Sequence, residues 1–130
     1  LVSSKICERM FGKHNVLLAA IRLTELPGIF VEQPLNGVEY FHLLFDRHEV
    51  IFAENALSES FYPGPEGIKD LPSEAREEIL AFFPEVRELN ISPQPAYPIP
   101  SSEHQKQFVA RHIKNNKSFI SCTEPSVLLA

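Results

Sequence analysis

The chain has few cysteines that could cross-link it and no apolar run long enough to span a membrane. Its two cysteines, Cys7 and Cys122, allow at most one disulfide. Their separation fits neither a disulfide framework nor a metal-ligand spacing, so we expect two free thiols. The longest uninterrupted apolar run, residues 16–21, is far shorter than the roughly 20 residues that span a bilayer, and no charged-then-apolar leader opens the chain. We expect a soluble chain with no membrane partner, and its compartment is left open.

Positive charge is also in short supply. Twelve Lys and Arg residues stand against 17 Asp and Glu, which gives a formal net charge of -5 over 130 residues. Proteins that bind nucleic acid without sequence preference carry a basic surplus that displaces counterions, so we expect no nucleic-acid partner. The length fits one ordinary domain.

The densest apolar and aromatic sequence lies between residues 37 and 63. Two runs, 38–45 and 50–53, are rich in β-branched and aromatic residues, and the charged residues 46–49 separate them. This pattern predicts a β-hairpin with a polar bend. Both faces of the first run are largely apolar, which predicts a strand buried on two sides.

The segments on either side of this stretch differ from one another. From residue 1 up to about residue 62, we expect a short helix over 5–11, capped by Ser3 or Ser4, and otherwise short strands and turns. After the rigid junction at 63–65, the pattern predicts a helix opened by Asp70 or Ser73 and ending near Phe83, a proline-rich linker over 90–100 and a helix from Ser102 to about Asn115. We therefore expect a mainly β region over 1–64 and a C-terminal α-helical extension over 65–130.

Three residues near the predicted bend are candidates for chemistry. The period of a strand puts His42 and Asp46 on one face, with His48 close by. A carboxylate next to an imidazole orients the ring and favours its charged form, as a general acid or base requires. The same trio could instead brace a tight turn, with Arg47 paired to Glu49 or Glu54, and the residues alone favour that alternative. A metal site is not expected, because such a bend supplies too few ligands.

Two stretches carry a resemblance to a known family. YFHLLFDRHEVIFAENALSESFYPG, at 40–64, resembles the closing segment of the Hint domain, the fold shared by inteins and the autoprocessing half of hedgehog proteins, in its bacterial version. LVSSKICERMFGKHNVLLAAIRL, at 1–23, is similar to the run that follows the central Thr/His block of that family. The resemblance covers residues 1 to 64 and only the C-terminal part of a Hint domain, which implies an incomplete Hint-like β fold.

The resemblance implies self-cleavage without a cofactor. In this family an N-terminal Cys or Ser attacks the preceding peptide carbonyl, and a Thr-x-x-His block assists, so the substrate is the protein's own upstream chain. Neither element is found in these residues, and Cys7 does not match the nucleophile. The resemblance assigns supporting catalytic roles to His42 and His48, with Asp46 as an added candidate. The chain is thus expected to carry part of the site without its nucleophile, and to be inactive alone.

A noncatalytic alternative stays open. In it, the Hint-like region is a scaffold, and the proline-rich segment and the basic last helix recruit a protein partner. We also expect possible self-association of the fragment, because the apolar run 38–45 would expose one face to water without the rest of a Hint domain.

Overall fold

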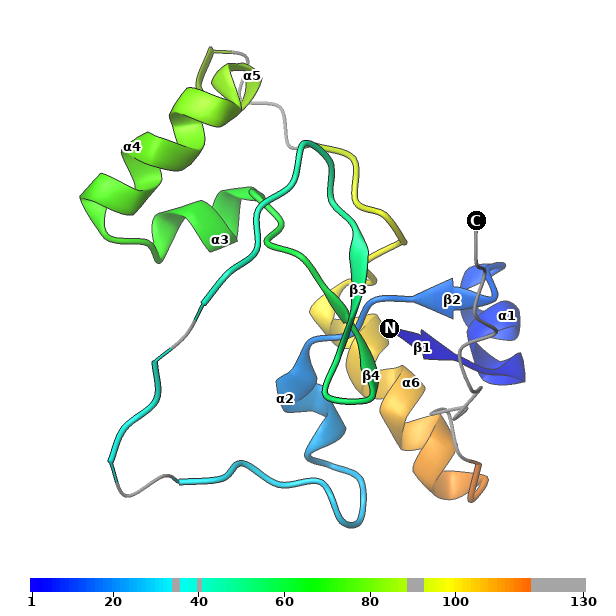
Figure 1. The fold of residues 1–130 in the computed structure, drawn as a ribbon. Helices are drawn as coiled ribbons and strands as arrows, with labels where there is room; N and C mark the ends of the chain where they lie inside the picture. The colour runs from blue at the N-terminus through cyan, green and yellow to red at the C-terminus, as the bar shows by residue number, and fades with distance from the viewer. Residues whose placement is uncertain (34–35, 40, 89–92, 118–130) are drawn as a thin grey trace, which may run out of the picture. The chain divides into compact units, whose positions relative to one another are not determined.

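A computed structural model describes residues 1–33, 36–39, 41–88 and 93–117 (Figure 1). In this part of the chain, 39% of the residues are helical and 11% lie in strands. The strands form two separate two-stranded antiparallel sheets. The predicted mainly β fold is therefore wrong. No helix among the described residues is both long enough and apolar enough to cross a bilayer.

The error lies mainly in the apolar run 38–45. Its described residues form no strand. All of them except the half-buried Leu44 are exposed, with Phe41 at 82% and Leu43 at 56% exposure. The hairpin lies one segment later, where β3 (Val50–Ala53) pairs with β4 (Ala56–Glu59). An apolar, aromatic run is compatible with a strand, but it does not determine which segment it pairs with.

The described residues form two compact units. We call residues 1–38 with 97–117 the helical unit and residues 39–96 the hairpin unit. The helical unit begins with β1 (Val2–Ser3), which pairs with β2 (Asn15–Val16) on either side of α1 (Lys5–Phe11). The Ser4 side chain accepts a hydrogen bond from the Cys7 N–H and so caps α1, and Gly12 ends the helix at φ 64°. The helix over 5–11 was predicted from the sequence with Ser3 or Ser4 as its cap, and the structure selects Ser4. Serine favours the start of a helix, and glycine adopts positive φ without strain.

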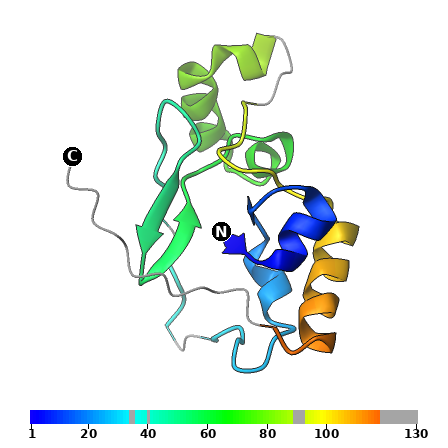
Figure 2. The same cartoon turned by 90° about the vertical axis from the view of Figure 1, so that its right-hand side faces the viewer.

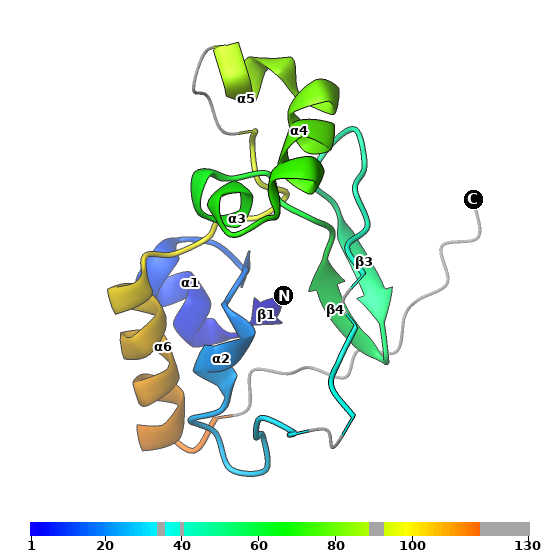
Figure 3. The ribbon, with the colours of Figure 1, turned by 90° about the vertical axis from the view of Figure 1, so that its left-hand side faces the viewer.

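The core of the helical unit joins residues from opposite ends of the chain. α2 (Ala20–Leu23) and α1 both pack against α6 (Ser102–Lys114) (Figure 3). Five buried residues form the core: Val2, Cys7, Val16, Phe108 and Val109. Two hydrogen bonds secure the returning segment, from the Leu17 N–H to the Pro98 carbonyl at 2.9 Å and from the Ala19 N–H to the Gln105 side chain at 3.0 Å. The last helix was predicted from Ser102 to about residue 115 and extends over Ser102–Lys114, with Ser101 as its cap.

The hairpin unit combines β3 and β4 with three helices. Its two strands run antiparallel beside one another in Figure 2. After β4 the chain forms α3 (Pro65–Lys69), α4 (Ser73–Phe82) and α5 (Pro84–Glu88). The predicted helix ending near residue 83 is thus α4, and Pro84 follows its C-cap residue Phe83. The predicted division of the sequence at residue 64 stays a prediction.

Candidate functional site

A tight turn sets the register of the hairpin that carries the site. Glu54 and Asn55, between β3 and β4, both have positive φ, at 48° and 60°. Two consecutive residues with positive φ are characteristic of a type I′ turn, whose twist matches that of the flanking strands. The turn pairs Ala53 with Ala56 and Val50 with Glu59.

One residue pair extends this register beyond β3 and β4. The Ser60 N–H donates to the Glu49 carbonyl at 2.9 Å, and the Glu49 N–H donates to the Ser60 Oγ at 3.0 Å. Ser60 is buried, so its hydroxyl is used in holding the backbone. In this register His48 and Glu59 are diagonal neighbours across the strands, a distance that long side chains can bridge.

His48 is the buried member of the predicted trio. Its side chain is 0% exposed, and its Nε2 atom lies 3.2 Å from a Glu59 carboxylate oxygen. Its Nδ1 atom accepts a hydrogen bond from the Ala96 N–H at 3.0 Å. The ring of Tyr62 lies 5.0 Å from the imidazole, centroid to centroid. Because Nδ1 accepts a hydrogen bond, the neutral ring must carry its proton on Nε2.

The Nε2 atom of His48 is not satisfied by Glu59. The separation of 3.2 Å is within ion-pair range, but the angles are not those of a hydrogen bond, and Nε2 has no hydrogen-bond partner among the described residues. We therefore do not count the His48–Glu59 contact as a hydrogen bond, because a short distance with poor alignment gives little hydrogen-bond energy. Buried polar atoms of native proteins nearly always have a partner, so this atom requires an explanation.

The other two predicted residues, His42 and Asp46, are not among the partners of His48 described above. The His42 side chain is exposed, and its ring meets that of Phe61 edge to face at 5.3 Å. Asp46 is exposed. In the described part of the chain, no hydrogen bond or ion pair connects His42, Asp46 and His48 to one another. The carboxylate beside His48 is that of Glu59, which sequence reasoning missed because it placed the hairpin bend at 46–49.

The alternative role of the trio as a brace also has partial support. Arg47 lies 3.9 Å from Glu49, as predicted, but both side chains are largely exposed. A pair of that kind contributes about 0–1 kcal/mol. No group of three His, Cys, Asp or Glu side chains in the described residues has an arrangement that would hold a metal ion.

The described cysteine differs from a reactive nucleophile. Cys7 is a free, fully buried thiol. Burial raises the pKa of the Cys7 thiol, and the negative charge of Glu8 raises it further. Because the thiolate is the attacking form of cysteine, this environment makes Cys7 unreactive. Cys122 lies outside the described residues.

Comparison with known proteins supports the resemblance seen in the sequence. A family model described as the Hint domain matches residues 1–65, which are half of the chain. That segment includes His48, Glu59 and the whole β3–β4 hairpin. No curated protein and no solved structure matches the chain. The chain therefore belongs to the Hint domain family of autoprocessing domains.

Proposed function

We propose that this chain supplies part of the self-cleavage site of a Hint-type domain, as its C-terminal part. The observation that carries the proposal is the buried Nε2 atom of His48, which has no hydrogen-bond partner in the described residues and lies 3.2 Å from Glu59. Because this buried polar atom lacks a partner within the segment that matches the Hint family, we infer that it binds a group that these residues do not supply. The reacting peptide is the ligand that the family chemistry provides.

The reaction determines what His48 can contribute. A thiol or hydroxyl adds to a peptide carbonyl carbon, and negative charge develops on the carbonyl oxygen. The C–N bond then breaks, its nitrogen leaves with a proton, and a thioester or ester remains. Since Nε2 of neutral His48 carries a proton, it can donate a hydrogen bond to the developing oxyanion. The same nitrogen cannot accept a proton while it holds one, so we assign His48 the role of donor and not of base.

Glu59 is proposed as a positioning residue. Its side chain is 46% exposed, whereas that of His48 is 0% exposed. A hydrated carboxylate at the edge of the buried ring can orient the Nε2 proton by charge and can move aside when a peptide carbonyl takes its place. The Ala96 N–H fixes the opposite nitrogen by a hydrogen bond, so Nε2 is left available to a further partner.

The nucleophile is proposed to lie outside these residues. Cys7 is buried with a raised pKa, and the Ser60 hydroxyl is engaged with the backbone of Glu49. His42 and Asp46 remain predicted contributors to catalysis, and both are exposed and available for contact. Their place in the mechanism rests on the resemblance and not on a contact with His48.

The proposal can be tested in the full-length gene product that contains these residues, with a reporter fused upstream. Thiol-dependent release of the reporter is the readout. His48→Ala should slow release by about 10²–10³-fold, the effect of removing one oxyanion donor. His48→Gln should recover part of that loss, because the Gln amide can donate from near the position of Nε2. Glu59→Gln should have a smaller effect than His48→Ala.

The matched control is His104→Ala, which removes an exposed histidine of α6 and should leave release unchanged. Far-UV circular dichroism of each variant separates lost chemistry from lost folding. Release by a folded His48→Ala variant at the wild-type rate would remove His48 from the mechanism.

A noncatalytic scaffold is the second candidate function, and one observation favours it. The Ala96 N–H already occupies Nδ1 of His48, so the ring holds Ala96 beside the start of the β3–β4 hairpin. If that is its whole role, the full-length product shows no thiol-dependent release. His48→Ala then only lowers stability, by about 1–3 kcal/mol for the loss of a buried partner.

A further inference from the structure

A proline-rich segment beyond the family match contacts the candidate site at two points. We call residues 93–96 the strap. The Tyr62 hydroxyl donates to the Pro93 carbonyl at 2.9 Å, and the Ala96 N–H donates to Nδ1 of His48 at 3.0 Å. Both contacts lie within the hairpin unit. Because the family match ends at residue 65, the strap brings to the site two backbone groups that the matched segment does not supply.

The sequence of the strap limits the hydrogen bonds that it can make. Pro93 and Pro95 have no N–H group, so Gln94 and Ala96 carry the only two backbone donors of the strap. The proline rings also fix φ at both positions, which lowers the entropy lost when the strap is held in one conformation. Among the described residues, the Ala96 N–H binds His48, whereas the Gln94 N–H makes no backbone hydrogen bond. Ala96 is therefore the donor that the strap offers to the site.

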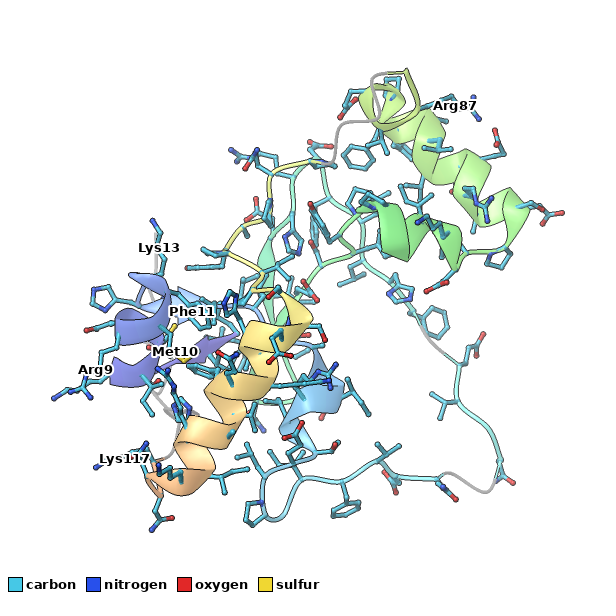
Figure 4. All side chains as sticks on the ribbon, turned by 180° about the vertical axis from the view of Figure 1, so that it is seen from behind. Arg9, Met10, Phe11, Lys13, Arg87 and Lys117 are labelled. Carbon is cyan, nitrogen blue, oxygen red and sulfur yellow. The ribbon has the colours of Figure 1, made fainter. Side chains whose placement is uncertain are left out.

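Tyr62 holds the other end of the strap. Its ring lies against the His48 imidazole, at 5.0 Å between centroids. It also lies close to the buried Gly64, where a Cβ atom would come within 2.6 Å of a ring carbon. On the upstream side of the strap, the chain is held by an ion pair between Arg87 of α5, labelled in Figure 4, and Glu77 of α4. Only glycine leaves space for the tyrosine ring at residue 64, and this close packing fixes the hydroxyl that binds the strap.

The bond from Ala96 determines where the neutral His48 ring carries its proton. A backbone N–H can donate but cannot accept, so it bonds to Nδ1 only while that nitrogen has no proton. The proton then lies on Nε2, where it is available to a developing oxyanion. With the proton on Nδ1 instead, Nε2 would be an acceptor and could not stabilise negative charge.

Glu59 does not secure this proton throughout the reaction. Its carboxylate also favours a proton on Nε2, but the side chain is 46% exposed and makes no aligned hydrogen bond to that nitrogen. In the proposed reaction the carboxylate moves aside when the peptide carbonyl arrives. The Ala96 N–H is then the contact, among those described, that keeps the proton on Nε2.

We propose that Ala96 is a positioning residue: the strap, anchored by Tyr62, uses the Ala96 N–H to keep the proton of His48 on Nε2 during self-cleavage. The inference rests on the proposed function, because the position of this proton matters to the reaction only if a peptide carbonyl reaches Nε2. It adds to that function a contribution from outside the residues that match the Hint family. The strap is then part of the site and more than a linker.

Nuclear magnetic resonance of the 130-residue chain tests where the proton lies. At about pH 8.5, where an ordinary imidazole is neutral, long-range proton–nitrogen spectra distinguish the ring nitrogen that carries the proton from the one that does not. Glu59→Gln provides the background, since an amide can donate or accept and so favours neither form. In this variant His48 should still carry its proton on Nε2. Adding Ala96→Pro, which removes the N–H, should let the proton appear on Nδ1 as well.

The matched control is Gln94→Pro in the same background, which removes an N–H of the strap that His48 does not use and should leave the proton on Nε2. Ala96→Gly keeps the N–H and should do the same. Tyr62→Phe removes the anchoring hydroxyl and should move the proton in part, which gives a second test if amide spectra show that Ala96→Pro does not fold. A proton on Nδ1 in the Glu59→Gln chain, or no change after either Ala96→Pro or Tyr62→Phe, would overturn the proposal.

The reporter assay on the full-length gene product connects the strap to the reaction. Ala96→Pro should slow thiol-dependent release by about 10–100-fold, the range found when hydrogen-bond partners of metal-bound histidines are removed. Ala96→Gly should release faster than Ala96→Pro. Release at the wild-type rate by a folded Ala96→Pro variant would overturn the positioning role. If even the wild type shows no release while the proton lies as expected, the proposed function fails and the assignment of the proton stands.

Discussion

Replacing Ser4 with alanine should destabilise α1 and α6 together. The Ser4 hydroxyl accepts the Cys7 N–H at 3.1 Å and lies 2.8 Å from Nε2 of His112. His112 Nδ1 lies 2.9 Å from the Phe108 carbonyl. A carbonyl can only accept, so Nδ1 carries the proton, and Nε2 accepts from the Ser4 hydroxyl. One side chain therefore caps the first helix and binds the last.

The expected cost follows from these two contacts. Losing a serine cap costs about 1 kcal/mol, and removing a hydrogen-bond partner of the buried His112 ring costs about 1–3 kcal/mol. We expect a total of about 2–4 kcal/mol for Ser4→Ala. Ser101→Ala is the matched control, because Ser101 caps α6 through a longer, exposed bond of 3.4 Å to the His104 N–H. Its loss should cost about 0.5–1 kcal/mol.

Amide hydrogen exchange is the suitable assay, since it reports the stability of each helix separately. Ser4→Ala should lower the exchange free energy of amides in both α1 and α6, whereas Ser101→Ala should affect chiefly the first turn of α6. A loss confined to α1, or one below about 0.5 kcal/mol, would show that the Ser4–His112 contact contributes nothing. A double-mutant cycle with His112→Ala should give a coupling of about 1–2 kcal/mol.

Two further predictions concern the same core. Burial lowers the pKa of His112 from its ordinary value of 6.5, so the unfolded chain binds more protons than the folded chain between the lowered pKa and 6.5. The contribution of neutral His112 to the stability of the helical unit should therefore be fully present above pH 6.5 and be lost as pH falls through the folded-state pKa. Amide exchange of α6 as a function of pH measures this, and stability that rises toward acid pH would contradict it. Phe108→Ala should lower the free energy of unfolding by about 3–5 kcal/mol, because Phe108 is fully buried. Phe41→Ala should change it by less than about 0.5 kcal/mol, because Phe41 is 82% exposed. Equal effects of the two changes in chemical denaturation would refute this account of the core.

The features that were predictable from the sequence are those with a local cause. Ser4 and Gly12 mark the two ends of α1 by their own chemistry, and Pro84 marks the end of α4 in the same way. The position of α6 also follows from its own periodicity. His48 was predicted as a candidate site residue because it is an imidazole beside charged residues near the predicted bend, and its role stays a prediction.

Features that depend on strand pairing were not predictable in this way. The turn at Glu54-Asn55 has a weak sequence signal, because both residues have positive φ but only Asn55 is of a type that favours it. An Asn-Gly pair there would have indicated the correct hairpin, and the register would then have placed Glu59 beside His48. The carboxylate was instead assigned to Asp46, which is nearer in sequence.

The antiparallel packing of α1 on α6 has a kinetic consequence. Ser4 and His112 are separated by 108 positions in the chain, and the core of the helical unit is incomplete until Phe108 and Val109 are in place. Contacts between such distant residues require a large loop to close first, which slows folding. On the ribosome, the apolar side of α1 would stay uncovered throughout the synthesis of the entire hairpin unit, so this interval is when the newly made chain most needs protection from aggregation.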